Sequence, residues 1–131
     1  MIVLDTSAWL FWLHDPSRLS KRARAAVRRA TDGDGACVSV ISVWEVALKN
    51  RLGKLALPLD LDAWFDLARR YPGIVLEPLR PDDAIASTRL PGDFHRDPAD
   101  RFIVALARRL GAPLVTTDEK ILAYPHVKAI G

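Results

Sequence analysis

The sequence lacks several residue patterns that mark common catalytic and metal sites. Among 131 residues there is one cysteine, Cys37, so no disulfide can form within the chain. The three histidines are scattered, and neither they nor Cys37 have the spacing of a zinc site. No serine, cysteine or histidine stands in a recognisable triad setting. Gly33-Asp34-Gly35 follows a predicted helix rather than a strand, which argues against a P-loop or a dinucleotide-binding loop.

Long hydrophobic runs are also missing. No apolar run approaches the roughly 18 residues that span a bilayer. The chain enters Ile2-Val3-Leu4 at once, without the basic region or cleavage site of a signal peptide. We therefore expect a cytoplasmic protein with no membrane segment, folded as one domain over residues 1–131. Lys and Arg number 19 against 16 Asp and Glu, a surplus that tolerates a polyanionic partner without establishing one.

The chain does contain a regular alternation of short apolar runs and amphipathic stretches. The apolar runs predict strands over residues 2–4, 36–39, 74–76, 113–116 and 127–130. The stretches between them have the three- and four-residue apolar spacing of helices. Strands that alternate with helices predict an α/β fold, a three-layer α/β/α sandwich with a central, mainly parallel sheet.

The stretch from His95 to Leu110 is the most informative. Its apolar residues have the spacing of a core-facing helix, and Pro98 suits the first helical position. Asp97 then suits the N-cap, and Asp100 lies in the first turn, so both carboxylates are near free backbone N–H groups. One interpretation is a capping pair, with Asp100 in place of the glutamate of a capping box. The other is a functional pair of acids.

Three further acids favour the functional interpretation. Asp5 directly follows the first predicted strand, and Asp118 directly follows the fourth. Glu45 lies on the apolar stripe of a helix, where a carboxylate is costly unless it is paired, for example with Lys49 four residues on. Because ligands of an open parallel sheet bind beyond the carboxyl ends of its strands, we expect these acids to converge there.

Converging carboxylates require a counter-charge. Two of them about 4 Å apart repel by about 4 kcal/mol at an effective dielectric constant of about 20. Oxygen ligands without cysteine or histidine indicate a hard divalent cation, Mg²⁺ or Mn²⁺. Such an ion lowers the pKa of a bound water and orients it towards a phosphodiester, so the acids predict metal-dependent hydrolysis of that bond.

Four short motifs carry a family resemblance. They are Asp5-Thr6-Ser7, Val43-Trp44-Glu45-Val46-Ala47, Asp97-Pro98-Ala99-Asp100-Arg101 with Ile103-Val104-Ala105 after it, and Thr116-Thr117-Asp118. In this order they resemble the PIN domain, and more narrowly the VapC ribonuclease toxins of bacterial toxin–antitoxin pairs. The resemblance covers essentially the whole chain. It implies a PIN-like fold and a Mg²⁺- or Mn²⁺-dependent endoribonuclease that cleaves RNA.

The resemblance also implies roles for individual residues. The family's four acidic positions match Asp5, Glu45, Asp100 and Asp118. Asp97 matches an extra acid of the subgroup with His-x-Asp-Pro-x-Asp-Arg, here residues 95–101. Asp5, Asp100 and Asp118 are expected to hold the metal, and Glu45 to orient a water on it. The residues expected to hold the carboxylate rotamers are Thr6, Ser7 and Thr116.

Two partners are implied in addition to RNA. Similar proteins form homodimers, and a small VapB antitoxin covers their active-site groove. The candidate anchors for such surfaces, or else ordinary core residues, are Trp9, Trp12, Trp44 and Trp64. Arg89, Arg96 and Arg101 are candidates for holding RNA phosphates, although Arg96 or Arg101 could instead pair with Asp97 or Asp100. The basic helix over 19–30 is either a solvated face or a nucleic-acid contact.

Other functions fit the sequence less well. A catalytically inactive PIN-fold module that binds nucleic acid or protein keeps the fold, but leaves the costly Glu45 without a purpose; calorimetry would detect no metal binding to it. An aspartyl phosphatase needs a second acid where Ser7 stands, two residues after Asp5. A receiver domain needs an aspartate after the third strand, where only Glu77 is found.

Overall fold

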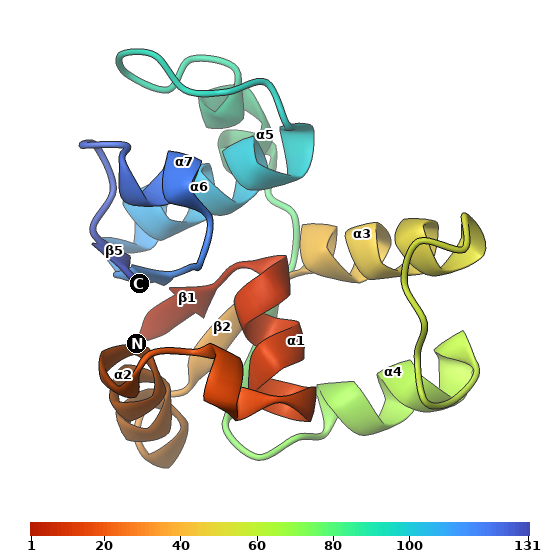
Figure 1. Cartoon of the computed structure of the whole chain (residues 1–131). Helices are drawn as coiled ribbons and strands as arrows, with labels where there is room; N and C mark the ends of the chain where they lie inside the picture. Colours follow the sequence, from red (N-terminus) through yellow and green to blue (C-terminus); the bar gives the residue numbers. More distant parts are fainter.

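The computed structural model describes residues 1–131 and contains one five-stranded sheet in which every strand pairing is parallel (Figure 1). The strand order is β3-β2-β1-β4-β5, so β1 lies at the centre. The strands are β1 (Ile2–Leu4), β2 (Ala36–Ser39), β3 (Ile74–Glu77), β4 (Leu114–Val115) and β5 (Ala129–Ile130). All five predicted strands are therefore present, although β5 is shorter than the predicted 127–130. β4 is shorter than the predicted 113–116, because Pro113 has no N–H for the ladder and contributes only its carbonyl, which accepts from the Val3 N–H at 2.9 Å.

Helices cover both faces of the sheet (Figure 1). They are α1 (Thr6–His14), α2 (Lys21–Asp32), α3 (Val40–Arg51), α4 (Leu61–Arg69), α5 (Pro81–Ser87), α6 (Pro98–Leu110) and α7 (Glu119–Leu122), with a short 3₁₀ turn at Pro16–Arg18. Val3 and Leu4 are both fully buried, and they belong to two different core clusters. Because successive side chains of a strand point to opposite faces, β1 has a core on each side. The predicted three-layer α/β/α sandwich is confirmed.

Each core has its own helices. The first cluster joins Leu4 to Trp9 of α1, Val27 of α2 and Trp64 of α4. The second joins Val3 to residues of α6 and α7. α6 begins as predicted, with Asp97 as its N-cap and Pro98 as its first residue, and ends at Gly111, whose φ of 60° suits glycine. Its apolar face packs on β1, which brings its first turn to the carboxyl edge of the sheet.

The tryptophans divide between core and surface. Trp9, Trp12 and Trp64 are buried, and the rings of Trp9 and Trp64 meet edge to face with centroids 5.3 Å apart. Core packing is therefore the correct interpretation for these three. Trp44 is different: 51% of it is exposed.

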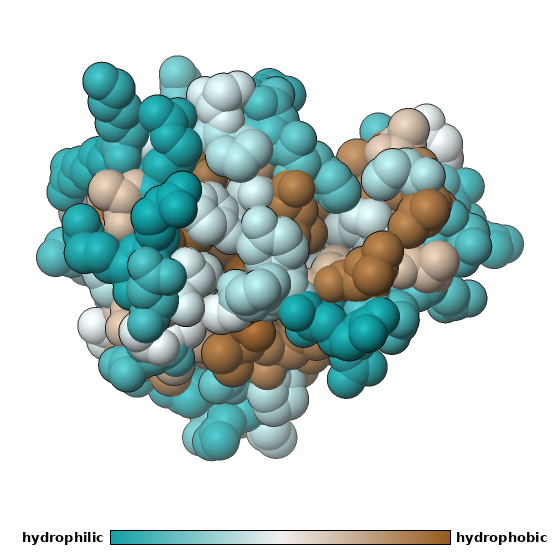
Figure 2. Space-filling view, turned by 90° about the horizontal axis from the view of Figure 1, so that it is seen from below, coloured by the Kyte–Doolittle hydropathy of each residue, from teal (hydrophilic) through white to brown (hydrophobic).

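Trp44 belongs to an exposed apolar stripe along α3, which we call the α3 stripe. Its residues are Trp44, Leu48 and Leu52, from α3 and its end. The exposed apolar residues Leu59, Leu67 and Tyr71 of α4 and its flanks instead line a pocket with Leu13 and His14 of α1. On the face of the molecule seen in Figure 2, hydrophobic side chains gather toward the right and at the lower centre of the view. None of the helices has both the length and the apolar character to cross a membrane.

Candidate active site

Asp5 is the most tightly held acid at the carboxyl edge of the sheet. It follows β1 and caps α1, with Oδ1 accepting a hydrogen bond from the Ala8 N–H at 2.8 Å. Its Oδ2 accepts from the Thr116 hydroxyl at 2.5 Å, and Thr116 Oγ1 in turn accepts from the Asp118 N–H at 2.9 Å. Thr116 therefore connects the carboxylate after β1 to the backbone after β4. Only 4% of Asp5 is exposed.

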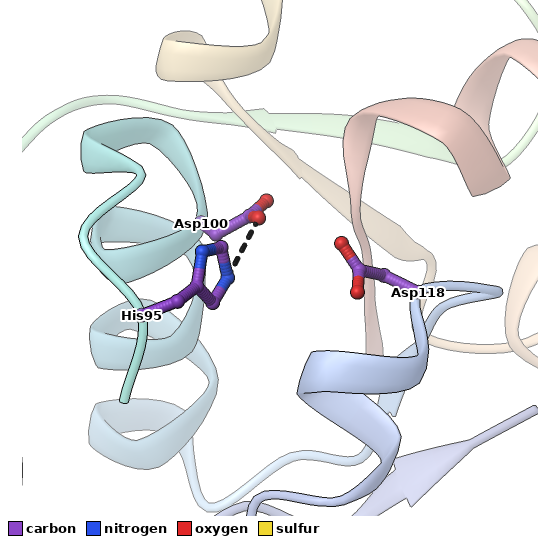
Figure 3. A group of neighbouring side chains, drawn as sticks. All are labelled: His95, Asp100 and Asp118. Atoms are coloured by element: carbon purple, nitrogen blue, oxygen red, sulfur yellow. Dashed lines mark ion pairs between the residues drawn. The ribbon is translucent and has the colours of Figure 1, made fainter. Parts of the chain in front are cut away.

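Asp100 and Asp118 face each other across the site (Figure 3). Asp100 comes from the first turn of α6, and Asp118 caps α7 by accepting from the Lys120 N–H at 2.8 Å. His95 lies beside them, with Nε2 3.0 Å from Asp100 Oδ2. One potential ligand atom from each of these three residues lies within 4.8 Å of the other two.

The remaining predicted acids lie around this group. Asp97 is exposed and accepts from the Asp100 N–H at 3.2 Å, so it acts as the cap of α6 and leaves Asp100 facing the site. The side chain of Glu45 on α3 is only 13% exposed, and it pairs with Lys49 at 3.1 Å. The ion pair with Lys49, which the sequence suggested as a structural role for Glu45, is thus present. The charge of Glu45 nevertheless raises the pKa values of Asp5 and Asp100.

The predicted hydroxyl residues differ in their surroundings. Thr116 contacts Asp5 as described. Thr6 is buried and donates to the Ser42 hydroxyl at 2.8 Å, which joins α1 to α3 rather than to a carboxylate. Ser7 is exposed and forms no side-chain hydrogen bond.

Burial and repulsion by neighbouring charges raise the pKa values of Asp5 and Asp100. Burial raises the pKa of Asp5 to about 6, against the opposing effect of the hydrogen bonds from Thr116 and Ala8, and the charges of Asp118 and Glu45 raise it further. Burial also raises the pKa of Asp100 to about 7, with added repulsion from Asp97, Asp118, Asp5 and Glu45. The neighbouring acids therefore lie close enough to Asp5 and Asp100 for their charges to disfavour the ionised forms of these two carboxyl groups.

These residues fit a divalent cation. Asp100 and Asp118 present carboxylate oxygens to a common point, and Asp5 lies near enough for its charge to act on Asp100. Each Asp5 oxygen accepts one hydrogen bond and keeps a second lone pair. The donor set is rich in oxygen, as a hard cation requires, but it includes one nitrogen, His95. Sequence reasoning missed His95, although the signal was present, since it stands five residues before Asp100 in the same motif.

The predicted arginines form no ion pairs with the acids. Arg101 uses its guanidinium for backbone carbonyls: Nε donates to Ser87 at 2.7 Å, and Nη1 donates to Phe94 at 3.1 Å and His95 at 3.2 Å. Arg96 is exposed and unpaired, which leaves it available to a phosphate. Arg89 lines a cavity of about 710 Å³ between α5 and α6, to which none of the site acids contributes.

Comparison with known proteins places this geometry in a family. The family model described as PIN domain matches residues 2–127. The chain belongs to the PIN-domain family. It is 30% identical to Ribonuclease VapC22 of Mycobacterium tuberculosis over 129 aligned residues. The alignment covers 98% of this chain and 95% of VapC22.

Solved structures with the same fold are more distant in sequence. One is the DNA-bound VapBC of Salmonella typhimurium, with a TM-score of 0.71 and 16% identity over 99% of this chain and 98% of that one. Another is VapBC2 of Rickettsia felis bound to a promoter DNA fragment, with a TM-score of 0.70 and 14% identity over the same shares. At this identity the likeness establishes the PIN fold alone.

The raised pKa values predict an unusual pH dependence of stability. Asp5 and Asp100 have pKa values of about 6 and about 7 in the folded chain, above their ordinary value of 3.8. Between about pH 4 and pH 8 the folded chain thus holds protons that the unfolded chain has lost, so the free energy of unfolding falls as pH rises. Thermal denaturation of metal-free protein in EDTA should show a lower Tm at about pH 8 than at about pH 5.

Asp100→Asn should make this decline shallower and raise the Tm at about pH 8, because it removes one of the repelling charges. Asp62→Asn, which changes an exposed aspartate in the first turn of α4, is the matched control and should keep the wild-type slope. A wild-type Tm that is constant or rises over this interval would contradict the described electrostatics.

Proposed function

We propose that this PIN-domain protein is a divalent-metal-dependent endoribonuclease that hydrolyses RNA phosphodiester bonds, as the toxin of a VapBC toxin–antitoxin pair. The observation that carries the proposal is the convergence of Asp5, Glu45, Asp100 and Asp118 from four separate elements. The similarity to a protein named Ribonuclease VapC22 supports RNA as the substrate. Mg²⁺ or Mn²⁺ is the proposed ion, and the cytoplasm the proposed location.

The chain's own residues have distinct parts in this mechanism. Asp100 and Asp118 would hold the cation, and Asp5 would complete the negative site. When bound, the ion supplies a water of lowered pKa and neutralises charge at the phosphate. Glu45 would accept a hydrogen bond from the attacking water and so orient it. Thr116 prevents Asp5 from rotating, because it donates to one carboxylate oxygen while it is itself held by the Asp118 N–H.

Cleavage of RNA tests the proposal directly. Purified protein, free of any bound antitoxin, should cleave total cellular RNA with Mg²⁺ or Mn²⁺ and should not do so in EDTA. Asp100→Asn should lower the rate by about 100-fold or more, because it removes a negative metal ligand without removing bulk. Asp62→Asn again serves as the control. Equal cleavage by Asp100→Asn would contradict the site, and no cleavage with either ion would favour an inactive binding module.

The α3 stripe is the surface that we propose for the antitoxin. Trp44, Leu48 and Leu52 are spaced by four residues, so they lie along one face of α3. Trp44 precedes Glu45 in the sequence, and the proposed segment would extend from this end of the stripe to the acidic site. An exposed apolar stripe of this kind fits an amphipathic segment of a partner protein. We also propose that the protein forms a homodimer, as the family resemblance implies.

Trp44→Ala tests this surface. The substitution should weaken binding of the cognate VapB-type antitoxin by about tenfold or more, because exposed aromatic residues dominate interface energies. The Tm of the isolated toxin should barely change, since Trp44 is 51% exposed. Ile85→Ala, on α5 and 50% exposed, is the control and should bind as the wild type does. Unchanged antitoxin affinity of Trp44→Ala, measured by calorimetry, would show that the partner binds elsewhere.

A further inference from the structure

His95 has a buried nitrogen without a hydrogen-bond partner. Nε2 is shielded from solvent and forms no hydrogen bond, although Asp100 Oδ2 is only 3.0 Å away. The contact has the distance of a hydrogen bond but not its alignment. A buried polar atom left in this way is costly unless another partner is bound. The proposed function does not use this nitrogen.

The spacing of the atoms around Nε2 suits shared coordination. Two neighbouring ligands of an octahedral ion, each about 2.1 Å from it, are about 3 Å apart. The separation of 3.0 Å between Nε2 and Asp100 Oδ2 matches this value. Asp118 supplies a third atom within 4.8 Å of both, from the opposite side of the site (Figure 3).

The protein holds the imidazole in this place. Arg101 donates to the carbonyls of Phe94 and His95, which fixes the two peptide groups on either side of the His95 Cα. The His95 ring lies against the Phe94 ring with centroids 4.4 Å apart, and Phe94 lies against Tyr124 at 4.7 Å. The segment before α6 is therefore anchored, and the position of His95 does not depend on its contact with Asp100. Arg101 thus positions the His95 ring through the backbone and does not contact Nε2 itself.

We propose that His95 Nε2 is a direct ligand of the metal ion, beside Asp100 and Asp118, and that it makes the site prefer Mn²⁺ over Mg²⁺. The proposal rests on the metal dependence of the proposed function and adds the chemistry of one ligand. Mg²⁺ keeps oxygen and water ligands and gains little from an imidazole, whereas first-row transition ions accept nitrogen as well as oxygen.

Pulsed electron paramagnetic resonance of the Mn²⁺-loaded protein tests this ligand without measuring activity. The wild type should show the coupling of a directly bound ¹⁴N nucleus, and His95→Ala should lose it. His126→Ala, which removes an exposed histidine that does not belong to this group of ligand atoms, should retain it. By calorimetry, His95→Ala should raise the Kd for Mn²⁺ by about tenfold or more and the Kd for Mg²⁺ by less than about twofold.

The outcomes separate this inference from the proposed function. Mn²⁺ that binds the wild type without ¹⁴N coupling, or coupling that persists in His95→Ala, would overturn the histidine ligand and leave a metal-dependent nuclease standing. Failure of both Mn²⁺ and Mg²⁺ to bind would overturn both. Should His95→Ala not fold, the wild-type spectrum alone decides.

Discussion

Electrostatic repulsion among carboxylates at one edge of the sheet is the constraint on which the rest of the structure depends. Parallel strands end at the same edge, and the chain places Asp5 after β1 and Asp118 after β4, with Asp100 at the start of α6 beside them. Asp5 and Asp118 also cap helices, so their negative charge is built into the local fold as well as into the site. Burial then raises the pKa values of Asp5 and Asp100, which leaves the site to be neutralised by protons or by a cation.

The scaffold prevents this repulsion from spreading the acids apart. Thr116 bridges Asp5 and the Asp118 backbone, and the two apolar cores fix the layers that carry them. Asp97 takes over the capping of α6, and Asp100 is thereby free to face the site. Arg101 adds a further restraint by holding the carbonyls of the segment before α6. A preorganised negative pocket of this kind binds a cation without paying for its own reorganisation.

Much of the fold was predictable, because hydrophobic periodicity and the residues at strand ends report on local structure. The five strands, their parallel pairing and the cap at Asp97 followed from these patterns. The features that the sequence did not predict depend on contacts between distant residues, which hydrophobic periodicity does not record. Arg101 contacts Ser87, 14 residues earlier, instead of pairing with an adjacent acid. His95 reaches Asp100 because of how the loop between them turns, and Trp44 differs from Trp9 only through the packing of whole helices.

On binding, a divalent cation is expected to replace protons on these carboxylates. Titration calorimetry of Mg²⁺ or Mn²⁺ into metal-free protein, repeated in buffers of different ionisation enthalpy, measures the protons released on binding. We expect net proton release at about pH 6, where Asp5 and Asp100 are partly protonated, and a decline of this release towards zero at about pH 9. A binding heat at about pH 6 that is the same in every buffer would contradict this expectation, as would the absence of binding.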